Sequence, residues 1–136
     1  KTQYWIREIM NRMYRNNIDG LCGNDDCGQM SAWYIFSAMG FYPVCPGTDQ
    51  YVIRRQRQMC IRDSLENGKT FTVRADKVSD KNRYIKSVTL NGQPYKKAYI
   101  THQDIMNGGE LVFQMTSSPN KRRQFTAEEK PYSLVE

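Results

Sequence analysis

The sequence predicts an α+β protein in which two helices are followed by a small antiparallel β lobe. Two observations lead to this prediction. Up to residue 39, apolar residues recur at helical spacing or form a nearly unbroken run. Beyond residue 45, short stretches alternate apolar and polar residues and are separated by Asn-Gly pairs, which is typical of β-hairpins. The 136 residues, of which 39% are hydrophobic and 25% charged, suffice for one modest globular unit.

The first helix is predicted over residues 3–15. Its apolar face would consist of Trp5, Ile6, Ile9, Met10, Met13 and Tyr14. Asn16 and Asn17 should end the helix, and a turn rich in Gly, Asn and Asp follows over residues 19–28.

The second helix is predicted over residues 29–39, with Gly40 directly after its C-terminus. Almost every side of this helix is apolar, and such a helix is normally buried all round. Burial of that kind is hard to achieve within 136 residues and natural in a large helical barrel. Because the chain also opens at Lys1 within a helical pattern, we expect it to be a piece of a longer protein.

The β lobe should contain several short strands, with hairpin turns at Asn67-Gly68 and Asn91-Gly92. The predicted strands comprise residues 51–53, 70–74, 85–90, 95–100 and 111–115. The second turn should make 95–100 the antiparallel partner of 85–90. A helical turn is expected at 104–106, and the polar tail from Thr116 onward should be mobile unless Pro131-Tyr132 docks.

The net charge of +6 does not indicate a nucleic-acid-binding protein. All of the excess positive charge lies in two short clusters, residues 54–64 and 121–123, so no basic face extends over the fold. No apolar stretch approaches the roughly 18 residues of a membrane span. The four cysteines match no zinc-binding spacing, and the spacing of Cys22 and Cys27 allows a disulfide without requiring one. We therefore expect neither nucleic acid nor a membrane as a partner.

The strongest candidate for a functional site is the turn before the second helix, where glycines flank Asn24, Asp25 and Asp26. Adjacent carboxylates repel each other unless a cation, a helix N-terminus or a proton relieves the repulsion. Three uses fit these residue types. The carboxylates can bind a hard cation such as Ca²⁺, one can act as a general base, or Asp25 or Asp26 can simply cap the helix. The residue pattern alone leaves all three uses open.

The run that contains this turn, GLCGNDDCGQMSAWYIFSAMGFYPVCPGTDQYVI, resembles the signature of glycoside hydrolase family 92, the inverting exo-α-mannosidases. The family's block reads Gly-Asn-(Asp/Glu)-Asp-x-Gly-Gln-Met-Ser-Ala-Trp, followed by a helix, Gly-Phe-Tyr-Pro and Pro-Gly. Later segments, among them VSDKNRYIKSVTLNGQPY and ITHQDIMNGGELVFQM, are similar to the family's C-terminal region. The resemblance covers nearly the whole chain except residues 54–64.

The resemblance implies an N-terminal β-sandwich and an (α/α)₆ barrel, whose last helices would be residues 1–44, with the β lobe in residues 45–136. It also implies a calcium-dependent mannosidase that inverts configuration with a catalytic acid and a carboxylate base. Asp26, at the constant Asp of the signature, would be the base, and Asp25 or Asn24 would position water or the calcium shell. Asp25 and Asp26 are thus also the candidate calcium ligands. The acid would lie outside this chain, which would be inactive alone.

Gln29 and Trp33 are the candidate contacts to the sugar, since aromatic faces stack on pyranose rings; a structural role in the core is the commoner alternative. His102 is expected to be a surface or hydrogen-bonded residue without a catalytic role. The resemblance implies α-mannoside glycans as substrates, α-1,2-linked mannose of N-glycans or mannans above all, and a periplasmic or secreted bacterial protein. The competing hypothesis is a stand-alone carbohydrate- or calcium-binding module, against which the wholly apolar helix argues.

Residues 54–64, RRQRQMCIRDS, depart from the family pattern, which has Gly-Ser-Pro and another strand at this place. The stretch has no strand alternation. We interpret it as an artefact of sequence assembly, with a solvated basic loop as the alternative, and assign no function to Cys60 or to the arginines. In either case the β lobe should be weakened by the loss of a strand.

Overall fold

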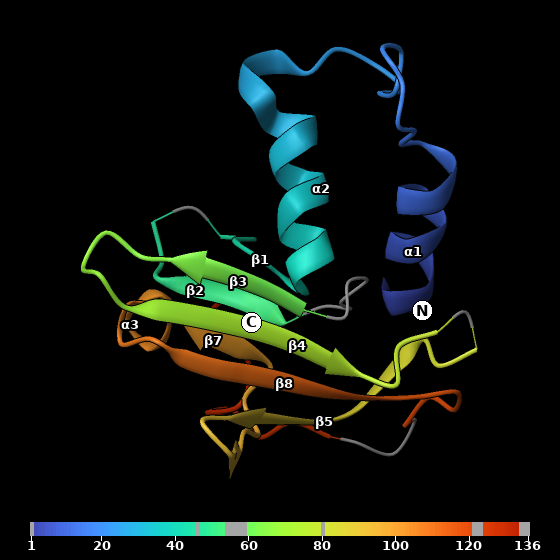
Figure 1. Ribbon diagram of the computed structural model, residues 1–136. Helices are drawn as coiled ribbons and strands as arrows, with labels where there is room; N and C mark the ends of the chain where they lie inside the picture. Colours follow the sequence, from blue (N-terminus) through green and yellow to red (C-terminus); the bar gives the residue numbers. More distant parts are fainter. Residues whose placement is uncertain (1, 46, 54–59, 80, 121–123, 134–136) are drawn as a thin grey trace.

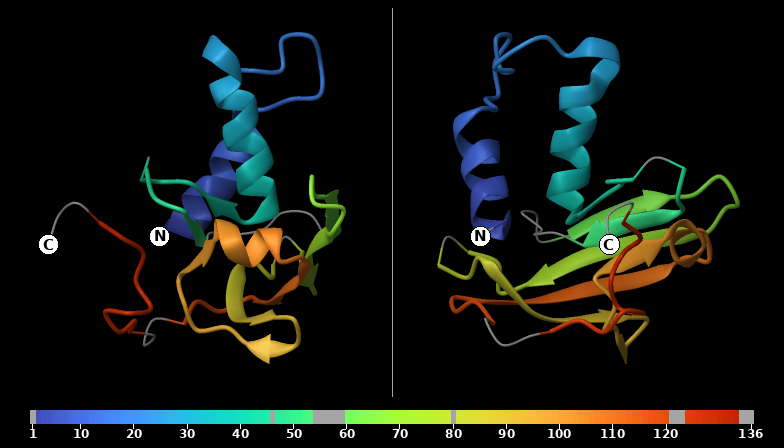
Figure 2. Two further views of the ribbon diagram at one scale, coloured as in Figure 1. Left: turned by 90° about the vertical axis from the view of Figure 1, so that its left-hand side faces the viewer. Right: turned by 180° about the vertical axis from the view of Figure 1, so that it is seen from behind.

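Two helices stand side by side on a layer of β-strands in the computed structural model (Figure 1), which describes residues 2–45, 47–53, 60–79, 81–120 and 124–133. Helix α1 comprises Thr2–Arg12 and α2 comprises Gln29–Met39, and the further views show the same pairing of the two helices (Figure 2). Ile6 and Met10 of α1 pack against Ala38 of α2. Both predicted helices are therefore confirmed.

Helix α1 ends three residues earlier than the sequence predicts. Tyr14 forms an isolated antiparallel β-bridge with Leu21, and the Arg15 amide donates a 2.8 Å hydrogen bond to the Gly20 carbonyl. A Cβ atom at residue 20 would lie 2.1 Å from the Arg15 carbonyl oxygen, so only glycine fits there. The close approach of the two chain segments replaces the last helical turn with a tight loop.

Helix α2 is not buried all round within this chain, and its burial in a larger helical barrel stays a prediction. Only Ser37 and Ala38 of α2 are buried, and the Ile35 side chain is 58% exposed. On α1, Trp5 is 59% exposed. The Ser37 hydroxyl is buried and has no hydrogen-bond partner within the described part of the chain. As predicted, α2 ends at Gly40, whose φ of 94° is left-handed.

The strands form two sheets, in the orders β1-β2-β7 and β3-β4-β8-β5-β6. Their bounds are Phe41–Tyr42 (β1), Gln50–Ile53 (β2), Cys60–Ser64 (β3), Thr70–Asp76 (β4), Tyr84–Leu90 (β5), Gln93–Pro94 (β6), Tyr99–Thr101 (β7) and Gly109–Thr116 (β8). The short helix α3, His102–Met106, lies between the last two strands. It covers the helical turn that was predicted at residues 104–106.

The expected purely antiparallel lobe is a mixed one, because β4 and β8 run parallel to each other. Strand β5 returns antiparallel after β4, but β8 is inserted between the two. A strand in that position must run parallel to one neighbour and antiparallel to the other. The α+β class holds, and the description of the lobe as antiparallel is corrected.

Two further predictions about the strands are wrong. Of the segment after Asn91-Gly92, only Gln93–Pro94 pairs with β5, while Tyr99–Thr101 pairs with β2 in the other sheet. Beyond this pair the Tyr95 amide still donates a 2.9 Å hydrogen bond to the Val88 carbonyl, and the chain then leaves β5. The stretch 54–64 does contain a strand: Cys60–Ser64 pairs antiparallel with β4 through the Asn67-Gly68 hairpin, and residues 54–59 lie outside the described residues.

The main core lies between the two sheets. Alternate residues of β4 and β8 point into it, and Ile100 and Phe41 enter it from the smaller sheet. The ring of Phe36 in α2 stacks on Tyr51, with the ring centroids 6.1 Å apart, and this contact joins the helices to the core.

The tail is docked at the predicted place, because the Tyr132 amide donates a 2.7 Å hydrogen bond to the Gln50 side chain. Among the described residues, no helix is long and apolar enough to cross a membrane.

Candidate functional site

The acidic turn lies at the end of the helix pair that points away from the strands (Figure 1). It connects the loop after α1 to the first turn of α2, and residues Asp26–Gly28 within it form a short 3₁₀ turn, η1. The predicted residues Asn24, Asp25, Asp26 and Gln29 are therefore brought together at one helix N-terminus. The positive end of the α2 dipole, together with its free N–H groups, favours negative charge at this place.

Asp25 is the anchor of the turn. Its Oδ1 atom accepts hydrogen bonds from the backbone amides of Met30, at 2.8 Å, and Ser31, at 3.0 Å. Its Oδ2 atom accepts a 2.5 Å hydrogen bond from the Ser31 hydroxyl. The hydroxyl of Ser31 and then its amide lower the pKa of Asp25, because they stabilise the ionised carboxylate more than burial disfavours it. The helix-capping interpretation is thus confirmed for Asp25.

The backbone between Asp25 and α2 turns sharply. Cys27 and Gly28 both have left-handed conformations, with φ of 53° and 77°, and the Gly28 amide donates to the Asp25 carbonyl at 3.0 Å. Glycine adopts this conformation at no steric cost, whereas for a residue such as Cys27 it costs roughly 1–2 kcal/mol. Interactions elsewhere in the turn must offset that cost, and the three bonds to the Asp25 carboxylate are the evident ones.

Asp26 differs from its neighbour. Its side chain is exposed, and within the described residues no hydrogen bond or ion pair engages its carboxylate. Asn24 and Gln29 are exposed beside it. Of the neighbouring carboxylates, one is fixed by three donors and the other is open to solvent, to a ligand or to the rest of a larger protein.

Trp33 is placed one turn further along α2. Its ring stacks on Tyr14 with centroids 5.7 Å apart and planes 12° apart, and the Tyr14 hydroxyl donates to the Met30 carbonyl at 3.1 Å. Trp33 belongs to the apolar cluster between the two helices. This placement favours the structural interpretation of Trp33 over direct contact with a sugar.

Comparison with known proteins decides the family. The sequence model of the glycosyl hydrolase family 92 catalytic domain matches residues 1–117. The chain belongs to this family. It superposes on a family 92 α-mannosidase of Bacteroides thetaiotaomicron with a TM-score of 0.89 and 45% identity, over 97% of this chain and 18% of the other. The resemblance of the signature to family 92 is therefore confirmed.

Two other relatives support the assignment. An inverting family 92 mannosidase of the same bacterium gives a TM-score of 0.87 at 43% identity, over 97% of this chain and 18% of that one. An uncharacterised secreted glycosidase of Arthroderma benhamiae is 36% identical over 102 residues, which is 72% of this chain and 13% of the relative. The chain thus spans less than a fifth of the length of each of these relatives.

This family 92 chain does not by itself supply a complete metal site. Oxygen donors of the kind that calcium prefers are present in Asn24 and Asp26. Across the described ranges, however, no group of three or more His, Cys, Asp or Glu side chains is placed to hold a metal ion. Because the two oxygens of Asp25 already accept three hydrogen bonds, that carboxylate has little capacity left for a cation. The residues present therefore do not fit a calcium ion without further ligands.

Sequence reasoning missed Ser31 and Tyr14. Ser31 follows Asp25 by six residues, a separation that matches no capping box, since the left-handed pair Cys27-Gly28 is inserted before the helix. Tyr14 was assigned only to the apolar face of α1. Both residues line a cavity of about 520 Å³ between the loop over residues 15–20 and α2. The sequence offered one sign of the role of Ser31, because the family block has a serine at this position.

All four cysteines and the histidine lie in the described part of the chain. No disulfide joins any two of the four cysteines, so the Cys22–Cys27 disulfide that the spacing allows is not formed. His102 lies at the start of α3 in the β lobe, where its Nδ1 atom is 3.4 Å from the Tyr51 hydroxyl. This position is on a different element from the acidic turn.

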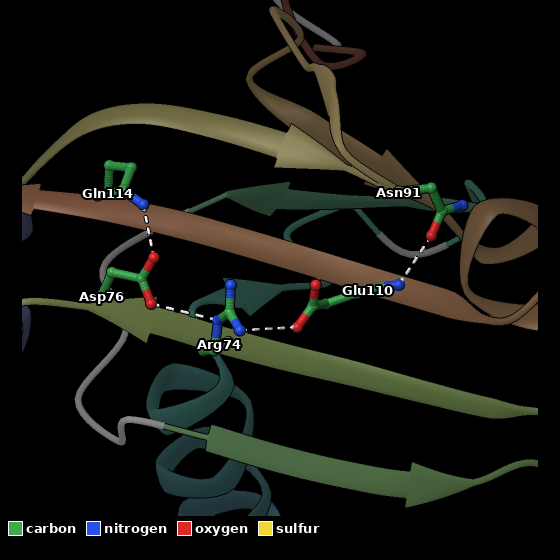
Figure 3. A network of polar contacts seen from close by, with 5 residues as sticks. All are labelled: Arg74, Asp76, Asn91, Glu110 and Gln114. Atoms are coloured by element: carbon green, nitrogen blue, oxygen red, sulfur yellow. Dashed lines mark hydrogen bonds and ion pairs between the residues drawn. The ribbon is translucent and has the colours of Figure 1, made fainter.

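A second group of polar side chains crosses the parallel strands β4 and β8 (Figure 3). Arg74 forms ion pairs with Asp76 at 3.2 Å and with Glu110 at 3.4 Å, and Gln114 donates to Asp76. Asn91 accepts a 2.8 Å hydrogen bond from the Glu110 amide. The two carboxylates share the single guanidinium of Arg74, and the group links β4 to β8 within the sheet.

Proposed function

We propose that the protein to which this chain belongs is an exo-acting α-mannosidase that inverts the anomeric configuration. The proposal is supported by membership of family 92 and by the described relatives, of which one is an inverting mannosidase and another is a mannosidase in complex with mannoimidazole. The observation that supports it in this chain is the exposed Asp26 carboxylate, which has no partner among the described residues and follows Asp25, whose carboxylate accepts three hydrogen bonds.

Asp26 is the general base of the proposed reaction. Inversion requires a carboxylate that accepts a proton from water as the water attacks the anomeric carbon, and an acid on the opposite side of the sugar that protonates the leaving oxygen. A carboxylate that is free of partners can approach water, whereas one with three donors cannot easily do so. The acid belongs to another part of the protein. Asp25 is the weaker candidate for direct catalysis, and Asn24 and Gln29 are the candidates for contacts to water or sugar.

The proposed substrates are glycans with terminal α-mannose, of the α-1,2-linked type found in N-glycans and mannans. A secreted or periplasmic location agrees with the description of the relative from Arthroderma benhamiae as secreted. Calcium is the proposed cofactor of the whole protein. Asn24 and Asp26 would supply at most part of its oxygen ligands.

Residues 1–44 are proposed to belong to an (α/α)₆ barrel and residues 45–136 to a β lobe behind it, with a β-sandwich elsewhere in the polypeptide. The exposed apolar side chains of Trp5 and Ile35 support this arrangement, because a helix pair that worked alone would place polar residues there. The same exposure speaks against the alternative of an independent carbohydrate- or calcium-binding module.

The test uses the full-length protein encoded by the gene, with α-1,2-, α-1,3- and α-1,6-linked mannobiose as substrates. Release of mannose from the α-1,2 isomer, with β-mannose as the first product seen by NMR, is expected. Asp26→Asn should lower kcat by about 10²–10⁴-fold, since a general base contributes that much. Asp19→Asn, at an exposed position in the same connection, is the matched control. Full activity of Asp26→Asn, or no mannose release by the unmodified protein, contradicts the proposal.

A further inference from the structure

Asp25 closes the turn around Asp26 from both sides. The Asp25 carbonyl accepts a hydrogen bond from the Gly28 amide at 3.0 Å, and its carboxylate reaches past Gly28 to Met30 and Ser31. Asp26 therefore lies within a loop that is closed by hydrogen bonds from Asp25 to Gly28 and to the first turn of α2. The direction in which the Asp26 carboxylate points depends on how firmly this loop is closed.

The Asp25 carboxylate has little capacity for chemistry of its own. A carboxylate offers about four acceptor sites, and three of them are used, two on Oδ1 and one on Oδ2. A general base must present a free oxygen to water, and a metal ligand must present a lone pair. Asp25 keeps at most one free site, on Oδ2, whereas the adjacent Asp26 carboxylate is exposed and accepts no hydrogen bond in the described part of the chain.

We infer that Asp25 and Ser31 form a clamp whose role is to position Asp26, so that Asp25 acts through the turn and touches neither water nor sugar. This inference rests on the proposed function. Of the three donors to Asp25, two are backbone amides that any residue supplies, and the third is the Ser31 hydroxyl. Ser31 is thus the one side chain that determines whether Oδ2 is fixed.

The hydrogen bonds of the clamp stabilise an unfavourable backbone conformation. Cys27 and Gly28 are both left-handed, and this pair of residues separates Asp26 from the helix. Left to itself, a non-glycine residue at position 27 would return to the ordinary region of φ and ψ, which would turn the residue before it in a new direction. The bonds from Asp25 across this pair to α2 oppose that relaxation.

The test compares two serines of the same helix in the full-length protein, with the α-linked mannobiose that the unmodified protein cleaves. Ser31→Ala removes the clamp hydroxyl, whereas Ser37→Ala removes a buried hydroxyl that has no partner in the described structure. Loss of a hydrogen bond to a charged group should lower kcat by about tenfold or more in Ser31→Ala, with KM nearly unchanged. Ser31→Thr, which keeps the hydroxyl, should restore most of kcat, and Ser37→Ala should leave it unchanged.

Asp25→Asn completes the test, because the amide keeps one acceptor oxygen and the size of the side chain. Its kcat should stay above that of Asp26→Asn by about tenfold or more if Asp25 only positions its neighbour. The inference is overturned if Ser31→Ala matches Ser37→Ala, if folded Ser31→Thr stays as slow as Ser31→Ala, or if Asp25→Asn is as inactive as Asp26→Asn. Failure of the proposed function looks different, since the unmodified protein would then release no mannose.

Discussion

The hydroxyl of Ser31 donates a 2.5 Å hydrogen bond to the carboxylate of Asp25, six residues earlier in the chain. Because the Ser31 and Met30 amides bond to the same carboxylate, Asp25 serves as the cap of α2 although it stands outside the usual capping position. This relationship ties the stability of the helix to the residue that precedes the proposed base.

The first prediction concerns this cap. Asp25→Ala should lower the melting temperature of the 136-residue chain by about 4–8 °C, since the first amides of α2 lose their acceptor. Asp19→Ala, an exposed aspartate in the preceding loop, should change it little. Thermal unfolding followed by circular dichroism measures both variants, and equal melting temperatures for the two would contradict the capping role.

The second prediction concerns Cys27. Its φ of 53° is unfavourable for most residues but tolerated by asparagine, so Cys27→Asn should raise the free energy of unfolding by about 1 kcal/mol. The matched control is Cys22→Asn, because Cys22 is also exposed but is not among the described residues with positive φ. Urea titration of both variants provides the measurement. A stabilisation of the same size in the control would mean that the effect comes from removing a thiol.

The third prediction concerns Gly109, where the backbone of β8 lies close to the Asn91 side chain in the turn after β5. A Cβ atom there would lie 2.0 Å from the Asn91 Oδ1 atom, and Gly109 has a φ of 121°. Gly109→Ala should therefore destabilise the chain by about 1–3 kcal/mol. Gly23→Ala is the control, because its Cβ would meet only the Met30 sulfur at 3.9 Å. Urea midpoints that are equal for both variants would be inconsistent with the observed packing.

The fourth prediction concerns alkaline pH. Burial, and then the Asp104 carboxylate 3.2 Å away, raise the pKa of the Tyr95 phenol above its usual value. In the unfolded chain the phenol ionises near pH 10, so its contribution to stability is complete below about pH 10 and is lost as the pH rises toward the folded pKa. Tyr95→Phe should therefore flatten the decline of the urea midpoint above pH 10. Tyr132→Phe, at an exposed tyrosine, should keep the original slope.

Local signals in the sequence were sufficient for the elements that depend on local chemistry. Helical periodicity predicted α1, a nearly unbroken apolar run ending at Gly40 predicted α2, and Asn67-Gly68 predicted a hairpin. The acidic turn was also recognisable, because its glycines and carboxylates are neighbours in the chain.

Features that depend on distant contacts were not predictable. Nothing in β8 signals that it inserts between β4 and β5, and Cys60–Ser64 becomes a strand only because β4 offers a free edge. Similarly, the bond from Ser31 to Asp25 exists because Cys27 and Gly28 reverse the backbone between them. A residue pattern does not record such a reversal.

The central place of β8 has a consequence for synthesis on the ribosome. Both neighbours of this strand precede it in the chain, so until Gly109–Thr116 has left the exit tunnel, β4 and β5 each present an unpaired edge. The five-stranded sheet can therefore close only after β8 has emerged from the ribosome, and a nascent chain stalled before residue 109 should be a target for chaperones or for aggregation.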